Sequence, residues 1–255
     1  MRDATKRIRA LLKKIPIGRR GSTAKRAARQ LLRGFDRFGI DLVFDVGANT
    51  GQFAQQIRAS GFKGHLVSFE PLSDAHRKLC ASAAHDPLWS VHERCALGGE
   101  DGVTELNIAG NSVSSSILAM TGIHSAAAPG SGYVGKEMAP LVKLDSIAKR
   151  YLERGQRPFL KIDTQGFEWP VLAGAQTTLP LIRGVLCELS LVVLYEGQHL
   201  WREMIDRLEG MGFTLWGLQP SFMDQHGRNL QTDAIFFRVQ GSVRSPDSGT
   251  PSPDS

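Results

Sequence analysis

The sequence predicts an α/β fold with a mostly parallel, twisted sheet, helices on both faces and an antiparallel final strand. Three observations support this prediction. Short apolar runs alternate with helical patterns from residue 42 onward, a glycine-rich turn follows the first run, and two apolar runs lie close together near the C-terminus. Strands that alternate with helices favour parallel pairing through right-handed crossovers. We therefore expect a Rossmann-like arrangement.

Local patterns place each element along the chain. Buried strands appear as short apolar runs, and helices as apolar residues three or four positions apart. The expected strands cover residues 42–44, 64–69, 89–92, 104–108, 159–162, 185–189, 213–218 and 234–239. The expected helices cover residues 52–59, 73–83, 171–179 and 200–211. The last two strands are expected to form an antiparallel pair.

Residues 109–140 interrupt this order. They are rich in Gly, Ser, Ala and Pro and show little periodicity. A loop of that length inside a compact domain is usually functional or disordered, so we expect a long, lid-like insertion. Its hydroxyl and amide side chains suit hydrogen bonding to a polyol, and the candidate substrate contacts are Asn111, Ser115 and His124. A plain solvated loop is the alternative.

The chain divides by composition into an N-terminal arm over residues 1–40, a catalytic domain over 41–240 and a tail over 241–255. The tail consists largely of Ser, Pro, Gly and Asp, and we expect it to be disordered. The charge is concentrated at the other end. Residues 1–33 hold twelve Lys or Arg and one acid, so their net charge is +11. The net charge of the whole chain is +6, so residues 34–255 carry a net charge of −5.

Two segments of the arm, residues 4–15 and 22–38, have an apolar face and a basic face when drawn as helices. One interpretation is a basic amphipathic element that lies on an anionic membrane surface. The other is a helix that packs its apolar stripe on the domain and leaves its charges in water. Because the charge is confined to the arm, the high isoelectric point does not by itself indicate a nucleic-acid partner.

The compartment is inferred from absences in the sequence. No apolar run approaches the ~18 residues of a membrane span, and Lys13 and Lys14 interrupt the apolar stretch that a secretory signal needs. Cys80, Cys95 and Cys187 are far apart and form no zinc or disulfide pattern. We expect a cytoplasmic protein, peripheral at the inner face of the membrane if the arm binds lipid.

The first apolar run ends in Asp45-x-Gly47-x-x-x-Gly51, and Glu70 ends the second run. Glycines let the backbone turn sharply beneath a ligand, and the helix that follows directs its amides at it. Asn49 breaks the G-x-G-x-x-G pattern of dinucleotide sites. Asp45 would repel a pyrophosphate but tolerates a sulfonium-bearing amino acid, and a carboxylate at Glu70 can accept both ribose hydroxyl protons. These features predict S-adenosylmethionine.

The residues after the third strand are expected to reach the adenine edge of this cofactor. They include Cys95 and Ala96, which would contact it mainly through backbone and packing. The alternative for Cys95 is a small buried hydrophobic residue with no ligand contact.

A second polar segment, Lys161-Ile162-Asp163-Thr164-Gln165-Gly166-Phe167-Glu168, follows a buried strand. Ligands of open α/β sheets bind at the carboxyl ends of the strands. We therefore expect Lys161, Asp163 and Glu168 at the reaction centre.

Together, the Asp45–Gly51 turn and the Lys161–Glu168 segment resemble the FkbM-type methyltransferase family. The resemblance extends from about residue 42 to 237 and also rests on Phe69-Glu70-Pro71, Ala96-Leu97-Gly98, Leu144-Asp145 and the strand that holds Glu188. Gln165 departs from it, because many members have Glu there. The resemblance implies a class I methyltransferase fold and O-methylation of a hydroxyl, often on a sugar or a polyketide-type natural product.

An alcohol is a poor nucleophile until its proton leaves, so a base or a Lewis acid is expected. Asp163 is the first candidate, as the base or as the ligand of a divalent metal such as Mg²⁺, with Glu168 and Glu188 as further candidates. Alternatively, Asp163 only caps the following helix or holds Lys161. His124 and His199 are other candidate bases.

The function expected from the sequence is S-adenosylmethionine-dependent O-methylation of a sugar hydroxyl, on a glycolipid or another glycoconjugate. O-methylation of a polyketide or other small natural product is the alternative. A nicotinamide-dependent oxidoreductase and a non-catalytic nucleic-acid-binding protein are more remote. The absent G-x-G-x-x-G argues against the former, and the lack of a basic, aromatic-rich surface in the body argues against the latter.

Overall fold

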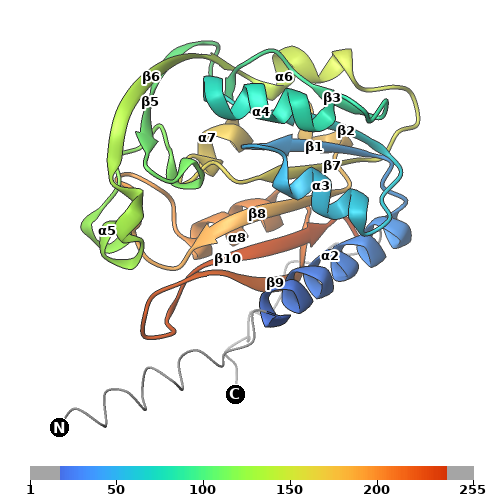
Figure 1. The fold of residues 1–255 in the computed structure, drawn as a ribbon. Coiled ribbons are helices and arrows are strands. Elements are labelled where there is room, and N and C mark those ends of the chain that lie inside the picture. The colour runs from blue at the N-terminus through green and yellow to red at the C-terminus, as the bar shows by residue number, and fades with distance from the viewer. Residues whose placement is uncertain (1–17, 240–255) are drawn as a thin grey trace, which may run out of the picture.

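The structure is a computed structural model that describes residues 18–239. A seven-stranded sheet forms its centre, in the order β3-β2-β1-β7-β8-β10-β9 (Figure 1). The strands are β1 (Leu42–Val46), β2 (His65–Phe69), β3 (Trp89–Val91), β7 (Pro158–Ile162), β8 (Gly184–Ser190), β9 (Thr214–Met223) and β10 (Asn229–Phe237). The first five of these are parallel, and β10 is antiparallel to both β8 and β9. The predicted fold class, including the antiparallel closing pair, is confirmed.

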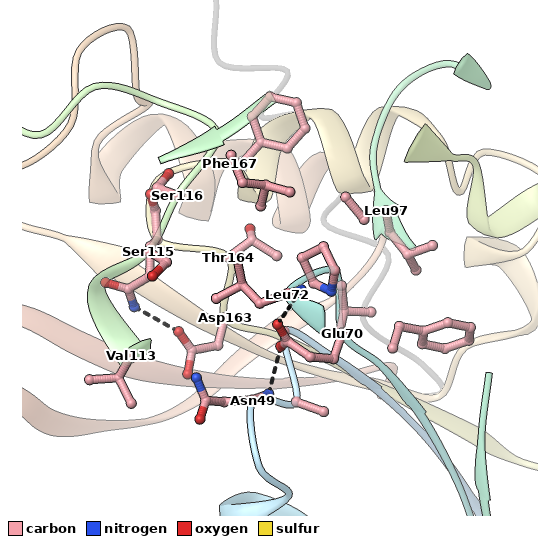
Figure 2. A pocket seen from close by; sticks show the side chains of 18 of the residues that line it. Asn49, Glu70, Leu72, Leu97, Val113, Ser115, Ser116, Asp163, Thr164 and Phe167 are labelled. Atoms are coloured by element: carbon pink, nitrogen blue, oxygen red, sulfur yellow. Dashed lines mark hydrogen bonds between the residues drawn. The ribbon is translucent and has the colours of Figure 1, made fainter. Parts of the chain in front are cut away.

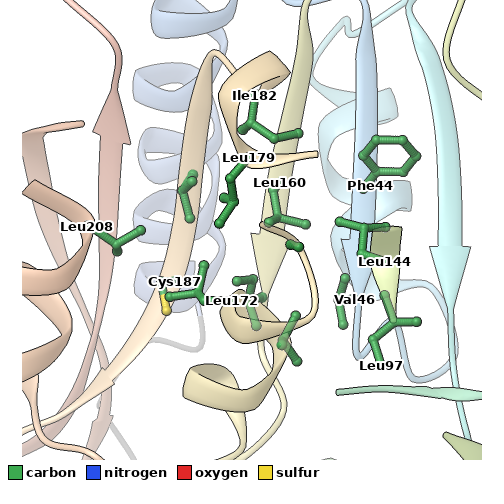
Figure 3. Close-up of a cluster of buried hydrophobic side chains, with 14 of the residues drawn as sticks. Phe44, Val46, Leu97, Leu144, Leu160, Leu172, Leu179, Ile182, Cys187 and Leu208 are labelled. Atoms are coloured by element: carbon green, nitrogen blue, oxygen red, sulfur yellow. The ribbon is translucent and has the colours of Figure 1, made fainter. Parts of the chain in front are cut away.

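Helices cover both faces of this sheet, because successive residues of each strand point to opposite faces. In β7, for example, Leu160 and Ile162 join one core cluster and Phe159 joins another. The first cluster packs against α6 (Leu144–Ile147), α7 (Glu168–Ala173) and α8 (Trp201–Gly210) (Figure 3). The second packs against α2 (Gly18–Phe38), α3 (Gln52–Ala59) and α4 (Ser73–Ala83).

Helix α2 contains the second amphipathic segment predicted for the arm. Its residues Ala28, Leu31 and Phe35 are buried against the sheet, and the Phe35 ring lies 4.7 Å from that of Phe159. Gly34 allows this approach, because an added Cβ would lie 2.5 Å from the Phe237 ring. The apolar stripe of α2 is therefore part of the core.

The segment expected to be one long loop, residues 109–140, is only partly irregular. Residues from 133 onward form β6 (Tyr133–Val142), which pairs antiparallel with β5 (Gly102–Ala109) and parallel with β4 (Ala96–Leu97). The loop prediction was wrong there because Gly135 and Pro140 and the exposed outer face hide the strand pattern. Pairing with β5, and not intrinsic propensity, makes this strand.

The remainder of that segment holds short helical turns, η1 (Ser112–Ser114), α5 (Gly122–Ala127) and η2 (Pro129–Ser131). Two more turns, η3 (Ala148–Arg150) and η4 (Leu179–Leu181), flank β7 and β8. Helix α7 begins at Glu168, where the turn in the Lys161–Glu168 segment was expected to open a helix, and it ends at Ala173, earlier than the predicted end at residue 179. The predicted helix over residues 4–15 and the tail over 241–255 lie outside the described residues. No helix within residues 18–239 is long and apolar enough to cross a membrane.

Candidate functional site

A cavity of about 280 Å³ lies at the carboxyl ends of β1, β2 and β7. Its wall includes Gly47, Asn49, Glu70, Cys95, Ala96, Ser115 and Asp163, all of which the sequence singled out. Figure 2 shows Asn49, Glu70, Ser115, Ser116 and Asp163 around it, with the Asn49 side chain close to the Asp163 carboxylate. The cavity therefore joins the two motifs that are more than a hundred residues apart in the chain.

The turn after β1 can be built only with a glycine at its first position. Gly47 has φ of +71°, and an added Cβ would lie 1.9 Å from the carbonyl oxygen of Asp163. The amides of Gly47 and Ala48 both donate to the Phe69 carbonyl, at 3.1 and 3.0 Å. This turn thus lies directly between the ends of β2 and β7. Gly51 is outside the wall and is the N-cap residue that precedes α3, with φ of +90°.

Glu70 is fixed at the end of β2 by two backbone amides. Asn49 N–H donates to Oε2 at 2.8 Å and Leu72 N–H donates to Oε1 at 2.9 Å. Burial raises the pKa of Glu70 to about 7, although both amides act to lower it. A carboxylate held in this way at a cavity wall suits the two hydroxyls of a ribose.

The wall beyond Glu70 is apolar. Cys95 is buried, and its burial raises the pKa of the thiol to about 12, so it acts as a small hydrophobic residue. Leu72, Leu97 and Phe167 continue this wall (Figure 2). A carboxylate beside an apolar slot fits the ribose and the adenine of S-adenosylmethionine.

Asp45 lies beneath the turn and outside the cavity wall. Its side chain is fully buried, its Oδ1 is 3.0 Å from Lys161 Nζ, and Ser68 Oγ donates to its Oδ2 at 3.3 Å. Burial acts to lower the pKa of Lys161, but the charges of Asp45 and Asp163 outweigh it and raise that pKa above its usual value. Asp45 therefore acts on the site through Lys161, whose ammonium also donates to the Gly47 carbonyl at 2.9 Å.

The far side of the site is formed by carboxylates on three adjacent strands. Asp163 directly follows β7, Glu188 is in β8, and Glu188 pairs in register with Asp233 of β10. Gln165 Nε2 donates to Asp163 Oδ1 at 2.9 Å and to Glu188 Oε2 at 2.8 Å. One neutral amide thus separates two carboxylates that would otherwise repel each other.

These carboxylates differ in environment. The side chain of Asp163 is 39% exposed and lines the cavity. Glu188 accepts a second hydrogen bond, from Gln231 Nε2 at 2.7 Å, and does not line the cavity. Burial, with the charges of Asp163 and Asp233, raises the pKa of Glu188 well above its usual value. Burial and the Asp163 charge raise the pKa of Asp233 to about 7. Asp163 is thus the member best placed to meet a substrate.

Glu168 serves its own loop. Its Oε1 accepts hydrogen bonds from Thr164 N–H at 2.9 Å, Thr164 Oγ1 at 3.1 Å and Gly166 N–H at 3.1 Å. Burial raises the pKa of Glu168 to about 7. Glu168 therefore lies behind the 164–167 turn and does not line the cavity. This position does not favour Glu168 as the catalytic base.

The remaining candidates separate into contacts and supports. Ser115 lines the cavity, whereas Asn111 caps η1 by accepting from Ser114 N–H at 3.1 Å. His124 is buried, with a pKa lowered by that burial, and its Nε2 lies 3.2 Å from the Tyr195 hydroxyl. His199 stacks on Trp169 with ring centroids 3.8 Å apart. Neither histidine lines the cavity.

Sequence reasoning missed the residue that orients Gln165. The Tyr195 hydroxyl donates to Gln165 Oε1 at 2.9 Å, and the tyrosine side chain is fully buried. Ser116 holds the same residue from another side, because its Oγ donates to the Gln165 carbonyl at 2.7 Å. The left-handed φ of +56° at Gln165 marks the same turn. No local pattern points to Tyr195, since it lies thirty residues beyond its partner.

The donors around Asp163 compete with a metal ion for its oxygens. Gln165 donates to Oδ1, and the Lys161 ammonium lies 3.7 Å from Oδ2. Within residues 18–239, no three His, Cys, Asp or Glu side chains are arranged to hold a metal. The metal role predicted for Asp163 stays a prediction.

Comparisons with known proteins agree with this site. The profile of the family described as Methyltransferase FkbM domain matches residues 45–215, which include the turn after β1, Glu70, Asp163 and Glu188. No curated protein matches the sequence.

Several solved structures match the chain at low sequence identity. Magnesium protoporphyrin IX methyltransferase from Synechocystis PCC 6803, solved with bound SAM, is 9% identical, with 86% of this chain and 81% of that chain covered and a TM-score of 0.47. Fibrillarin from Aeropyrum pernix, with bound S-adenosyl-L-methionine, is 10% identical, with 77% of this chain and 66% of that chain covered and a TM-score of 0.43. TehB from Haemophilus influenzae is 8% identical, with 82% of this chain and 62% of that chain covered and a TM-score of 0.44.

Proposed function

Because this chain belongs to the FkbM methyltransferase family and is an S-adenosylmethionine-dependent enzyme, we propose that it methylates a hydroxyl oxygen of a sugar. The observation that carries the proposal is the Asp163–Gln165–Glu188 arrangement beside the cofactor cavity. It supplies a partly exposed carboxylate whose orientation is fixed, which is what removal of a proton from an alcohol requires.

The roles of the chain's own residues follow from their positions. Glu70 would accept the ribose hydroxyl protons, and the apolar wall at Leu72 and Leu97 would hold the adenine. When bound, S-adenosylmethionine supplies an electrophilic methyl group. Gln165 engages Asp163 Oδ1, so Oδ2, which lies 3.7 Å from Lys161 Nζ, would be the oxygen that accepts the proton of the acceptor hydroxyl. Holding both partners in place can contribute about 7–11 kcal/mol to lowering the barrier.

A sugar is favoured over other alcohols by the polar side of the cavity. Asn49, Gln52, Ser112, Ser115 and Ser116 all line it. Hydroxyl and amide side chains in one wall suit an acceptor with several hydroxyls, since each of these groups can both donate and accept hydrogen bonds. A polyketide or another small natural product is the second candidate, supported by the apolar residues Val113 and Ile117 in the same wall.

The acceptor is further proposed to be part of a glycolipid or another glycoconjugate, and the enzyme to be cytoplasmic and peripheral at the membrane. This part of the proposal rests on the basic arm, of which residues 18–38 form α2. It concerns the carrier of the sugar and is independent of the chemistry at Asp163.

Transfer of a labelled methyl group into separated lysate fractions tests the acceptor. We expect label in the lipid or polysaccharide fraction, and a parallel reaction with EDTA reports any metal requirement. Label only among small non-sugar metabolites would favour the second candidate, and label only in RNA would contradict a sugar acceptor. Calorimetry with S-adenosylhomocysteine and with NAD checks the cofactor independently.

A further inference from the structure

Four arginines form a continuous stripe on the outer side of α2. Arg26, Arg29, Arg33 and Arg37 are all exposed and are spaced by three, four and four residues. This spacing places them on one side of a helix, opposite the buried Ala28, Leu31 and Phe35. At 1.5 Å per residue the stripe is about 16 Å long. Figure 1 shows α2 on the outside of the molecule, beside α3 and β9.

The groove beside this stripe also holds two carboxylates, Asp36 and Asp41, but the arginines are not paired with them. Among the residues that the structure describes, none of the four guanidinium groups forms an ion pair with a carboxylate. The acid of α2 on this side is Asp36, which is exposed. Lys63 adds a positive charge across the groove that separates α2 from residues 60–64. The chain before α2 adds a further net charge of +5 over residues 1–17.

An aromatic side chain lies at one end of the stripe. Trp216 of β9 is 41% exposed, and the Arg37 guanidinium lies 5.6 Å from its ring. Phe38 packs edge-to-face against the same ring, with centroids 5.4 Å apart. A tryptophan held beside arginines is typical of the headgroup level of a bilayer, where its ring and its N–H meet different surroundings. We call Arg26, Arg29, Arg33, Arg37, Lys63 and Trp216 the arginine face.

We propose that the arginine face binds the surface of an anionic phospholipid membrane. A flat row of unpaired guanidinium groups on a rigid helix complements lipid phosphates, and arginine binds phosphate with paired hydrogen bonds. The proposal rests on the membrane location proposed above and assigns the contact to a defined surface of the folded domain, not to the arm as a whole. It concerns where the enzyme works, so it stands or falls separately from the sugar acceptor.

The buried side of α2 decides how the inference is tested. Deleting residues 1–33 would remove Ala28 and Leu31 from the core, so loss of binding after such a deletion could reflect unfolding. Substituting exposed charges avoids this. The test variant is Arg26→Gln/Arg29→Gln/Arg33→Gln in the full chain. The matched control is Arg154→Gln/Arg202→Gln/Arg228→Gln, which removes the same charge from exposed positions elsewhere.

The measurement is co-sedimentation with vesicles of phosphatidylcholine containing phosphatidylglycerol, and with phosphatidylcholine alone. At ~1 kcal/mol per arginine near an anionic surface, the test variant should partition about 100-fold more weakly than wild type. The control variant should partition nearly as strongly as wild type. Added salt should weaken vesicle binding of the control variant and of wild type. Trp216→Ala should also weaken partitioning, by a smaller factor.

Three results would overturn the inference. The first is equal partitioning of the test variant and wild type on anionic vesicles. The second is equal binding of wild type to anionic and neutral vesicles. The third is wild-type binding to RNA that depends on the three arginines, without binding to vesicles. Circular dichroism of each variant confirms that α2 remains folded.

Discussion

The ammonium of Lys161 lies 3.0 Å from the carboxylate of Asp45, and the two side chains are 5% and 0% exposed. This buried pair connects the turn after β1 to the reaction side of the cavity, because the same ammonium lies 3.7 Å from Asp163 Oδ2. Removing one partner of a buried ion pair leaves the other charge without compensation. The pair is therefore a structural element of the site, and the first prediction concerns its stability.

Lys161→Met should lower the free energy of unfolding by about 3–5 kcal/mol, because Asp45 would remain buried without its cation. Urea denaturation followed by circular dichroism measures this change. Lys149→Met at an exposed position is the matched control and should change the unfolding free energy by less than about 0.5 kcal/mol. Similar values for the two variants would contradict a structural role for the pair.

Asp163→Asn should lower the rate of methyl transfer by about 10²–10⁴, because the amide cannot accept the hydroxyl proton. The substitution preserves shape and leaves Glu70 and the apolar wall unchanged, so affinity for S-adenosylhomocysteine should stay within a few-fold of wild type. Single-turnover transfer and calorimetry measure the two quantities. A variant that keeps wild-type rates would exclude Asp163 as the base.

Glu70 should make cofactor affinity depend on pH. Burial raises its pKa to about 7, and the ionised carboxylate is the better acceptor for ribose hydroxyls. Affinity should therefore increase as pH rises from about 6 to about 8, by no more than tenfold per pH unit for one proton. Calorimetric titration with S-adenosylhomocysteine at several pH values tests this. Glu70→Gln should bind more weakly and lose the dependence, and a dependence that persists in it would implicate another group.

Gln165→Glu should move the acid limb of the pH–rate profile to higher pH, by about one unit or more. The substitution removes the amide donor shared by Asp163 and Glu188 and adds a third like charge, which disfavours ionisation of all of them. The rate at neutral pH should fall and recover in part under alkaline conditions. Gln225→Glu, at an exposed position, controls for the change in net charge and should leave the profile unchanged.

The sequence predicted the parts of the site that depend on local signals. Gly47 and Glu70 were predictable because a tight turn after a buried strand needs a glycine, and because the second strand of such a unit ends at the same edge. Asp163 was predictable because its strand also ends at this edge of the sheet. The closing strands were predictable because their apolar runs are long.

What the sequence did not predict depends on contacts between distant residues. Strand β6 exists because β5 offers it a partner, and its own residues hardly favour a strand. Glu168 looks like a second catalytic acid until its three hydrogen bonds to its own loop are known. His124 looked like a substrate contact, but it supports Tyr195, which is 71 residues away.

Residues 112–116 are hydrogen-bonded at both ends to residues on other parts of the cavity wall. Ser112 Oγ accepts from Asn49 Nδ2 at 3.2 Å, and Ser116 Oγ donates to the Gln165 carbonyl at 2.7 Å. Ser112 and Ser116 also line the cavity, so we expect release of the spent cofactor on this side to require both hydrogen bonds to open. Its residence time then depends on motion of this segment, and turnover slows through product inhibition whenever that motion slows. The same hydrogen bonds that assemble the site would in this way set the pace of the catalytic cycle.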